Sequence, residues 1–304
     1  MKVLVTGVKG QLGFDVVNEL EKRGHTAIGV DVDTMDITNS EQVENVIKAN
    51  MPEAVIHCAA YTAVDLAEDN KELCDKINGE GTENIAKVCK KLDCKHIVKC
   101  AKILDIPMIY ISTDYVFNGE GERPWQPDDT VTIPLNEYGY SKYLGEQAVQ
   151  KYVKDFYIVR IAWVFGINGK NFVKTMLNVG KNHDTVRVVN DQIGTPTYTF
   201  DLARLLVDMI ETEKYGYYHA TNEGGYISWY DFACEIYRQA GMDIKVIPVS
   251  TEEYGLSKAA RPFNSRLDKS KLKEAGFTPL PTWQNAVERY IKYLKEQEQA
   301  TGNE

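Results

Sequence analysis

The chain has 304 residues, of which 43% are hydrophobic and 26% are charged, and its formal net charge is −9. This composition is typical of a globular protein with one large domain or two interleaved ones, and the acidic balance argues against a general nucleic-acid binder. No apolar run approaches the roughly 20 residues of a membrane span, and "MKVLVTG" is too short for a secretion signal. We therefore expect a cytoplasmic protein that contacts no membrane and no nucleic acid.

The first half of the chain alternates short β-branched runs with longer helical patterns. Strands are predicted at 2–6, 26–31, 53–60, 107–113 and 156–166. Between them, helices are predicted from Leu12 to Gly24, at 39–50, over about 71–93 and at 138–153. Repeated strand–helix–strand units make right-handed crossovers, so this order predicts an α/β fold with a Rossmann-type, doubly wound parallel sheet covered on both faces.

The second half is mixed and predicts a smaller α/β lobe that binds the substrate. Its expected elements are a helix near 170–181, a strand at 186–189 and helices at 199–212, 228–241 and 282–297. No linker rich in Pro, Gly or Ser separates the halves. We assign 1–165 to a dinucleotide-binding domain and 166–304 to an interleaved lobe, and we expect elements around 186–212 to return to the first domain.

A tandem repeat interrupts the first half. "NIAKVCKKLDCK" (84–95) and "HIVKCAKILDIP" (96–107) align without gaps. Twelve residues turn a helix by about 1200°, which leaves the second copy roughly 120° out of phase, so the two copies cannot serve one packed face. We expect one copy to form an excursion away from the chemistry, with its lysines on a solvated face rather than a docking surface. The cluster Cys94-Lys95-His96 lacks the spacing of a zinc site, and no metal is predicted.

A glycine loop follows the first strand. "GVKGQLG" places Gly7, Gly10 and Gly13 between that strand and the first helix, where glycines permit a tight turn and the close approach of a pyrophosphate. Asp31 ends the second strand, where an acidic residue can accept hydrogen bonds from the adenosine ribose. This favours NAD, but Lys9 is placed to meet a 2′-phosphate, so NADH and NADPH both stay open. The predicted cofactor contacts are Gly7, Gly10, Gln11, Leu12, Gly13, Asp31, Asp36, Ile37, Ala59, Ala60, Tyr61, Tyr138 and Lys142.

The stretch "NEYGYSKYLGE" (136–146) contains a candidate acid. Tyr138 and Lys142 are four residues apart and share a helix face, whereas Tyr140 and Tyr143 point elsewhere. A free tyrosine has a pKa of about 10, and a nearby ammonium favours the phenolate. Thr113, at the carboxyl end of the 107–113 strand, is placed to polarise a carbonyl oxygen. Together these residues predict general acid catalysis beside a hydride donor.

These motifs resemble the extended short-chain dehydrogenase/reductase superfamily, and within it the dTDP-4-dehydrorhamnose reductase family. The matching stretches run almost end to end and include "CAAYTAVD", "ISTDYVFNGE", "YGYSKYLGE", "VRIAWVFG", "DQIGTPT" and "ARPFNS". Members of that family reduce the 4-keto group of dTDP-4-dehydro-L-rhamnose with NADPH or NADH. The repeat at 84–107 departs from the family pattern.

The resemblance implies roles for individual residues. It makes Thr113, Tyr138 and Lys142 the catalytic set. It implies a nucleotide-sugar substrate held by Val64, Asp114, Tyr115, Trp163, Asn171 and Gln192, with Lys174, Thr195, Thr197 and Arg261 as further candidates. Trp163 could instead pack in the core between the lobes, and Arg261 could instead pin the lobes together.

Two other functions fit the same sequence. A nucleotide-sugar epimerase or dehydratase would use the same tyrosine and lysine while recycling bound NAD. A non-catalytic protein, similar to the regulatory subunit of methionine adenosyltransferase, is disfavoured by the intact Thr-Tyr-Lys set. The sequence leaves both a monomer and a homodimer open.

Overall fold

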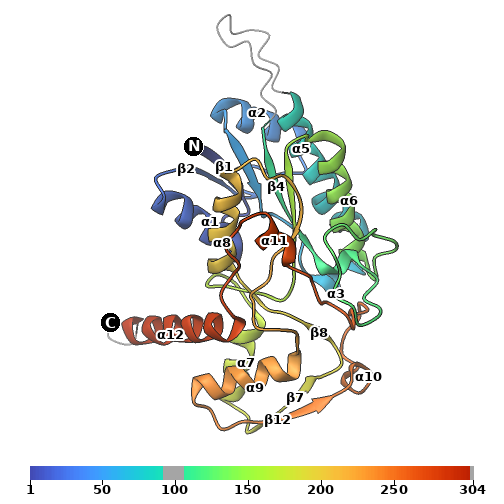
Figure 1. Cartoon of the computed structure of the whole chain (residues 1–304), viewed down its shortest axis with the longest axis vertical. Helices are drawn as coiled ribbons and strands as arrows, with labels where there is room; N and C mark the ends of the chain where they lie inside the picture. Colours follow the sequence, from blue (N-terminus) through green and yellow to red (C-terminus); the bar gives the residue numbers. More distant parts are fainter. Residues whose placement is uncertain (92–105, 302–304) are drawn as a thin grey trace, which may run out of the picture.

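A six-stranded parallel sheet forms the centre of the molecule in the computed structural model, which describes residues 1–91 and 106–301 (Figure 1). The strand order is β10-β5-β4-β3-β1-β2, and all neighbouring pairs are parallel. The predicted α/β, Rossmann-type fold is thus confirmed. The strands are β1 (Lys2–Thr6), β2 (Thr26–Val30), β3 (Ala54–His57), β4 (Met108–Thr113), β5 (Phe156–Ile161) and β10 (Gly216–His219).

Helices cover both faces of this sheet, and the strands alternate their side chains between the two. On β1, Val3 and Val5 pack with α1 (Gln11–Lys22) and α8 (Thr199–Ile210). Leu4 points to the other face, where the core includes side chains of α2 (Ser40–Asn50), α5 (Thr82–Lys91) and α6 (Glu137–Tyr152). Apolar residues on both faces of one strand are what a buried parallel sheet requires.

The helix predicted over 71–93 is divided. It consists of α4 (Lys71–Asp75), a π-helical segment η1 (Lys76–Gly81) and α5, and a short helix α3 (Val64–Ala67) precedes it. Gly81 ends the π-helical segment close to Ile37, because a Cβ there would lie only 2.7 Å from the isoleucine side chain. Within the π-helical segment, Asn78 donates to the Tyr61 carbonyl at 3.0 Å and accepts from the Tyr61 N–H at 2.8 Å. The segment therefore anchors the loop that follows β3.

The strand predicted at 156–166 is also divided. β5 ends at Ile161, Trp163 has a φ of +49°, and β6 (Val164–Phe165) then pairs with β9 (Thr197–Tyr198). A left-handed backbone is unusual for a tryptophan, and here it turns the chain out of the sheet.

The second lobe lies beyond one end of the sheet (Figure 1). Its core includes Phe165, Phe232, Trp283 and Tyr290. β7 (Thr185–Val189) pairs with β12 (Lys245–Val249), and β8 (Ile193–Gly194) pairs with β11 (Ile227–Ser228). Its helices are α7 (Phe172–Gly180), α9 (Trp229–Ala240), α10 (Thr251–Tyr254) and α12 (Trp283–Thr301). The 3-10 turn η2 (Asp114–Val116) follows β4, and α11 (Ser270–Glu274) packs on the main sheet through Leu272.

We expected the segment 186–212 to return to the first domain. Only part of this segment lies against the main sheet. α8 packs there with α1, whereas β7 pairs with β12 outside the main sheet. β10, for which no strand was predicted, forms the edge of the main sheet beside β5. The division of the chain near residue 165 stays a prediction.

Most of the tandem repeat at 84–107 lies outside the described residues, as do Cys94 and His96. The described part of the first copy contributes Ile85, Ala86 and Cys89 to the core. Within 1–91 and 106–301, no helix is long and apolar enough to cross a membrane. The same residues contain no group of three or more His, Cys, Asp or Glu side chains able to hold a metal ion.

Candidate active site

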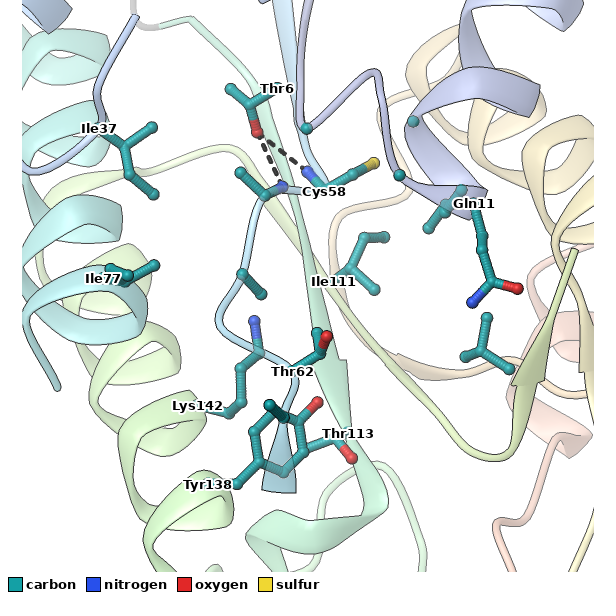
Figure 2. Close-up of a pocket in the computed structure, with 18 of the residues that line it drawn as sticks. Thr6, Gln11, Ile37, Cys58, Thr62, Ile77, Ile111, Thr113, Tyr138 and Lys142 are labelled. Carbon is teal, nitrogen blue, oxygen red and sulfur yellow. Dashed lines mark hydrogen bonds between the residues drawn. The ribbon is translucent and has the colours of Figure 1, made fainter. Parts of the chain in front are cut away.

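A cavity of about 1330 Å³ lies at the carboxyl ends of the central strands (Figure 2). Open parallel sheets bind ligands at this edge. The cavity reaches from the glycine loop to the helix that carries Tyr138 and Lys142. Seventeen of the predicted site residues line it: Gly7, Gly10, Gln11, Leu12, Gly13, Asp31, Asp36, Ile37, Ala59, Ala60, Val64, Thr113, Asp114, Tyr115, Tyr138, Lys142 and Trp163.

The glycine loop is packed too tightly for side chains. Gly7 has a φ of +69°, and a Cβ there would lie 2.8 Å from the backbone of Ala59. A Cβ on Gly13 would lie 2.2 Å from the Gly7 carbonyl oxygen. The Thr6 hydroxyl accepts from the N–H groups of Cys58 and Ala59, both at 3.1 Å (Figure 2). This narrow cradle at the N-terminus of α1 fits the pyrophosphate of a dinucleotide.

The charged residues Asp31 and Lys9 line the end of the cavity where we predicted the adenosine, and Asp33 lies beside Lys9 outside the lining. The Asp31 carboxylate accepts from the N–H groups of Lys9 and Val32, both at 2.9 Å, which fixes its orientation at the end of β2. Lys9 Nζ lies 2.8 Å from Asp33 Oδ2, and both side chains are exposed. Carboxylates here suit ribose hydroxyls, whereas a 2′-phosphate would need the lysine.

Tyr138 and Lys142 are positioned by the start of α6. Asn136 caps this helix, with its Oδ1 accepting from the Gly139 N–H at 2.8 Å. Gly139 lets the first turn approach η2, because a Cβ there would lie 2.1 Å from the Tyr115 carbonyl oxygen. Lys142 is buried, and its Nζ lies 4.1 Å from the centre of the Tyr110 ring. Figure 2 shows Tyr138, Thr113 and Lys142 grouped at one end of the cavity.

Burial controls the protonation of this group. It raises the pKa of Tyr138 above its ordinary value of 10.0, while the neighbouring Thr113 hydroxyl opposes the shift. We expected the Lys142 ammonium to lower that pKa, but no such lowering is seen, and desolvation of the phenolate is the largest influence. Tyr138 is therefore held as a neutral phenol at neutral pH, which is the form that can give up a proton.

The pKa values of Lys142 and Asp114 are also shifted toward neutral pH. Burial lowers the pKa of the Lys142 ammonium to about 7, partly opposed by the charge of Glu146. Burial also raises the pKa of Asp114 to about 6, against the effect of its bond from the Thr113 hydroxyl. Asp114 Oδ2 is buried without a hydrogen-bond partner among the described residues. Groups shifted in this way gather where polar ligands are bound.

We expect Lys142→Met to stabilise the nucleotide-free protein at pH 7 by a few kcal/mol. The pKa of Lys142 is about 7 when folded and near 10.4 when unfolded. Between these values the unfolded chain binds more protons, so the cost of the buried charge is complete below pH 7 and disappears toward pH 10. Urea unfolding of both proteins at pH 7, 8.5 and 10 tests this. A stability difference that does not change with pH would contradict it, and Lys154→Met at an exposed site serves as the control.

Trp163 lies in the cavity wall, where it already has an aromatic partner. Its ring stacks on Trp229 with centroids 3.8 Å apart and planes at 17°. A Cβ on Gly194 would come within 2.9 Å of the indole, so this glycine leaves room for it. Val64, Asp114 and Tyr115 line the same cavity.

Three predicted site residues do not line the cavity. Tyr61 is held by Asn78, and Gln192 donates to the Thr251 hydroxyl at 3.0 Å. Asn171 caps α7 and directs its amide toward other side chains of the protein. For these three, the geometry supports positions in the framework rather than in the cavity wall.

The further candidates are also engaged within the protein. Lys174 donates to the carbonyls of Ile167 and Gly169, and the hydroxyls of Thr195 and Thr197 donate to the carbonyls of Gly225 and Ala162. Arg261 Nη2 donates to Asp65 on α3 at 2.7 Å, so Arg261 ties the segment between α10 and α11 to the sheet domain. Its Nη1 is buried without a partner among the described residues.

The cavity also contains residues that the sequence reading missed. Thr6, Thr62, Lys76 and Lys170 line it. Lys170 had a detectable signal, because it stands at the start of the helix predicted near 170–181, and helix N-termini bind anions that a lysine can also contact. Thr6 had none, because a threonine ending a strand is ordinary.

Comparison with known proteins extends the similarity over both lobes. The chain matches the family described as RmlD substrate binding domain over residues 1–296. The Bacillus subtilis spore coat polysaccharide biosynthesis protein SpsK is 37% identical, with 96% of this chain and 97% of SpsK covered. The structure of a Clostridium acetobutylicum dTDP-4-dehydrorhamnose reductase is 41% identical with a TM-score of 0.90, covering 97% of this chain and 100% of that one. A Bacillus anthracis dTDP-4-dehydrorhamnose reductase, solved in complex with NADP, is 39% identical with a TM-score of 0.87, covering 96% and 99%.

Proposed function

The chain belongs to the RmlD substrate-binding domain family of NAD(P)-dependent oxidoreductases, and we propose that it reduces the 4-keto group of dTDP-4-dehydro-L-rhamnose to give dTDP-L-rhamnose. The observation that carries this proposal is the shared cavity, in which Tyr138, Lys142 and Thr113 lie with the glycine loop. The substrate rests on the relatives, two of which are reductases of this sugar nucleotide.

When bound, the dinucleotide supplies a hydride to C4 of the sugar. Tyr138 donates its phenolic proton to the oxygen that was the carbonyl, so the C=O becomes a CH–OH. Thr113 turns its single hydroxyl proton from the Asp114 carboxylate to the same oxygen, and the Lys142 ammonium stabilises the phenolate left on Tyr138. A raised pKa on Tyr138 suits this direction, because the proton is present before transfer.

Turnover of the purified protein with dTDP-4-dehydro-L-rhamnose tests the proposal. We expect stoichiometric oxidation of NADH or NADPH, followed by its absorbance, and dTDP-L-rhamnose as the product. Conversion of a sugar nucleotide without net consumption of NAD(P)H would instead identify an epimerase or dehydratase. Binding of the dinucleotide with no turnover of either kind would contradict the proposed reaction.

We expect Asp33→Asn to shift cofactor preference toward NADPH. Lys9 lines the cavity and its Nζ is paired with Asp33, so losing that carboxylate frees the lysine for a 2′-phosphate and removes a repelling charge. The ratio of kcat/KM for NADPH over NADH should rise roughly three- to tenfold at low ionic strength and less in high salt. Asp33→Glu, which keeps the charge, is the matched control. An unchanged ratio in Asp33→Asn would show that the 2′ position lies away from Lys9.

A further inference from the structure

Asn171 connects the second lobe to the glycine loop through one side chain. It lies at the N-cap of α7, is only 9% exposed, and its Nδ2 donates to Gln11 Oε1 at 3.0 Å. Gln11 is the first residue of α1 and lines the cavity. The same Nδ2 approaches the Gly166 carbonyl oxygen at 2.9 Å and the hydroxyl of Tyr290, on α12, at 3.0 Å.

Two backbone groups fix which way the Asn171 amide faces. The Lys174 N–H can only donate, and it lies 3.0 Å from Asn171 Oδ1. The Gly166 carbonyl can only accept, and it lies on the Nδ2 side. The Tyr290 hydroxyl already donates to the Gly166 carbonyl at 2.6 Å and so faces Asn171 as an acceptor. The oxygen and nitrogen of Asn171 therefore cannot exchange places without setting donor against donor and acceptor against acceptor.

The orientation of Asn171 then determines that of Gln11. Because Asn171 presents a donor, Gln11 must turn its oxygen toward it, which leaves Nε2 on the opposite side. Figure 2 shows Gln11 extending into the cavity with its amide nitrogen on the side of Ile111 and its oxygen directed away. Nε2 has no hydrogen-bond partner among the described residues. The stem is confined as well, because a Cβ on Gly166 would lie 3.2 Å from Gln11 Cβ.

We propose that Asn171 is a positioning residue that holds the Gln11 amide with its nitrogen toward the diphosphate of the bound dinucleotide. Gln11 stands directly after Gly10 at the N-terminus of α1, beside the cradle that fits a pyrophosphate, and phosphate oxygens accept but never donate when ionised. A glutamine that could rotate freely would have to be ordered by the phosphate itself on binding, which would weaken the binding. The inference rests on the proposed function in one respect, namely that a dinucleotide occupies this cavity.

The test uses ADP-ribose, which carries the diphosphate but no nicotinamide, and adenosine, which carries neither. Asn171→Asp keeps an oxygen for the Lys174 N–H but offers Gln11 an acceptor, so Gln11 should rotate and turn its oxygen to the phosphates. We expect the Kd for ADP-ribose to rise about tenfold or more and the Kd for adenosine to change less than about twofold. Gln11→Met removes the amide at similar size, and in that background Asn171→Asp should change the Kd for ADP-ribose less than about twofold.

A purely structural role for Asn171 would give a different pattern. Asn171→Asp would then weaken adenosine and ADP-ribose alike, or act equally in the parent protein and in the Gln11→Met background, and either result would overturn the proposal.

In Asn171→Asp, a carboxylate oxygen replaces the nitrogen that donates to the Gly166 carbonyl, and the resulting repulsion can destabilise α7. Gln11→Glu therefore provides a second variant. The introduced carboxylate keeps the bond from Asn171 and turns a charged oxygen to the cavity, so the Kd for ADP-ribose should rise more than about tenfold with an unchanged melting temperature. A Kd close to that of the parent protein would refute the assignment. Failure of the parent protein itself to bind ADP-ribose would count against the proposed function instead.

Discussion

Tyr138→Phe should lower kcat for the keto reduction by about 10²- to 10⁴-fold, the range expected when a positioned general acid is removed. The variant keeps the ring that packs edge-on against Tyr115, with centroids 5.6 Å apart, and loses only the hydroxyl. The glycine loop and Lys142 are untouched, so the Kd for NAD(P)H should change little. Single-turnover rates and dinucleotide fluorescence titration measure the two quantities separately.

Tyr140→Phe is the matched control for this experiment. Tyr140 lies on the same helix two residues later, and it is 45% exposed. Its hydroxyl is roughly 160° around the helix from Lys142, so its loss should leave kcat within about twofold of the parent value. A Tyr138→Phe variant that retains a tenth or more of the parent kcat would show that another group delivers the proton.

Glu146→Ala should reduce the free energy of unfolding by about 3–5 kcal/mol, because it leaves a buried guanidinium without its counter-charge. Arg160 on β5 makes two parallel bonds to the Glu146 carboxylate, both at 2.8 Å, and their side chains are 3% and 1% exposed. Ser112 on β4 donates to the same carboxylate at 2.6 Å. The pair joins α6 to two central strands, so its loss should appear in equilibrium urea unfolding monitored by circular dichroism.

Two further variants separate charge from packing in that measurement. Glu44→Ala removes an exposed ion pair with Lys48 on α2 and should cost less than about 1 kcal/mol. Replacing Glu146 and Arg160 together by Leu and Met removes both buried charges and should recover most of the loss. A double variant as unstable as Glu146→Ala would mean that the hydrogen-bond geometry, rather than an unpaired charge, sets the cost.

Much of the sheet could be predicted because each strand carries a local signal. The β-branched runs at β1, β3, β4 and β5 stand between helical patterns, and this alternation predicts that the strands run parallel. β10 carries no such signal, because "GYYH" is four residues long and its place is set only by pairing with β5. The π-helical segment at 76–81 was also missed, since it depends on contacts of Gly81 and Asn78 with distant loops.

The residues of the candidate site also differ in whether a local sequence pattern or only a contact between distant segments reveals them. Tyr138 and Lys142 could be paired from a spacing of four residues on one helix, and Thr113 from its place at a strand end. Glu146 and Arg160 lie on different elements, and nothing in either segment shows that two charges meet in the core. Asn171 was predicted near the substrate because a polar residue at a helix start can face a ligand as readily as its own helix. Only the three-dimensional contacts distinguish these cases.

α8 and β10 return to the main sheet from the second half of the chain, and this limits where the chain can be cut into stable fragments. A fragment ending near residue 165 would contain the whole glycine loop and the Tyr-Lys helix. It would nevertheless lack Leu202, Leu205 and Leu206, which cover α1 and the adjacent strands, and it would leave β5 as an unpaired edge. Such a fragment would expose a broad apolar surface and open hydrogen-bonding groups, both of which promote aggregation. The half that carries the glycine loop is therefore completed by residues from the second half of the chain, so we expect the two halves to fold together.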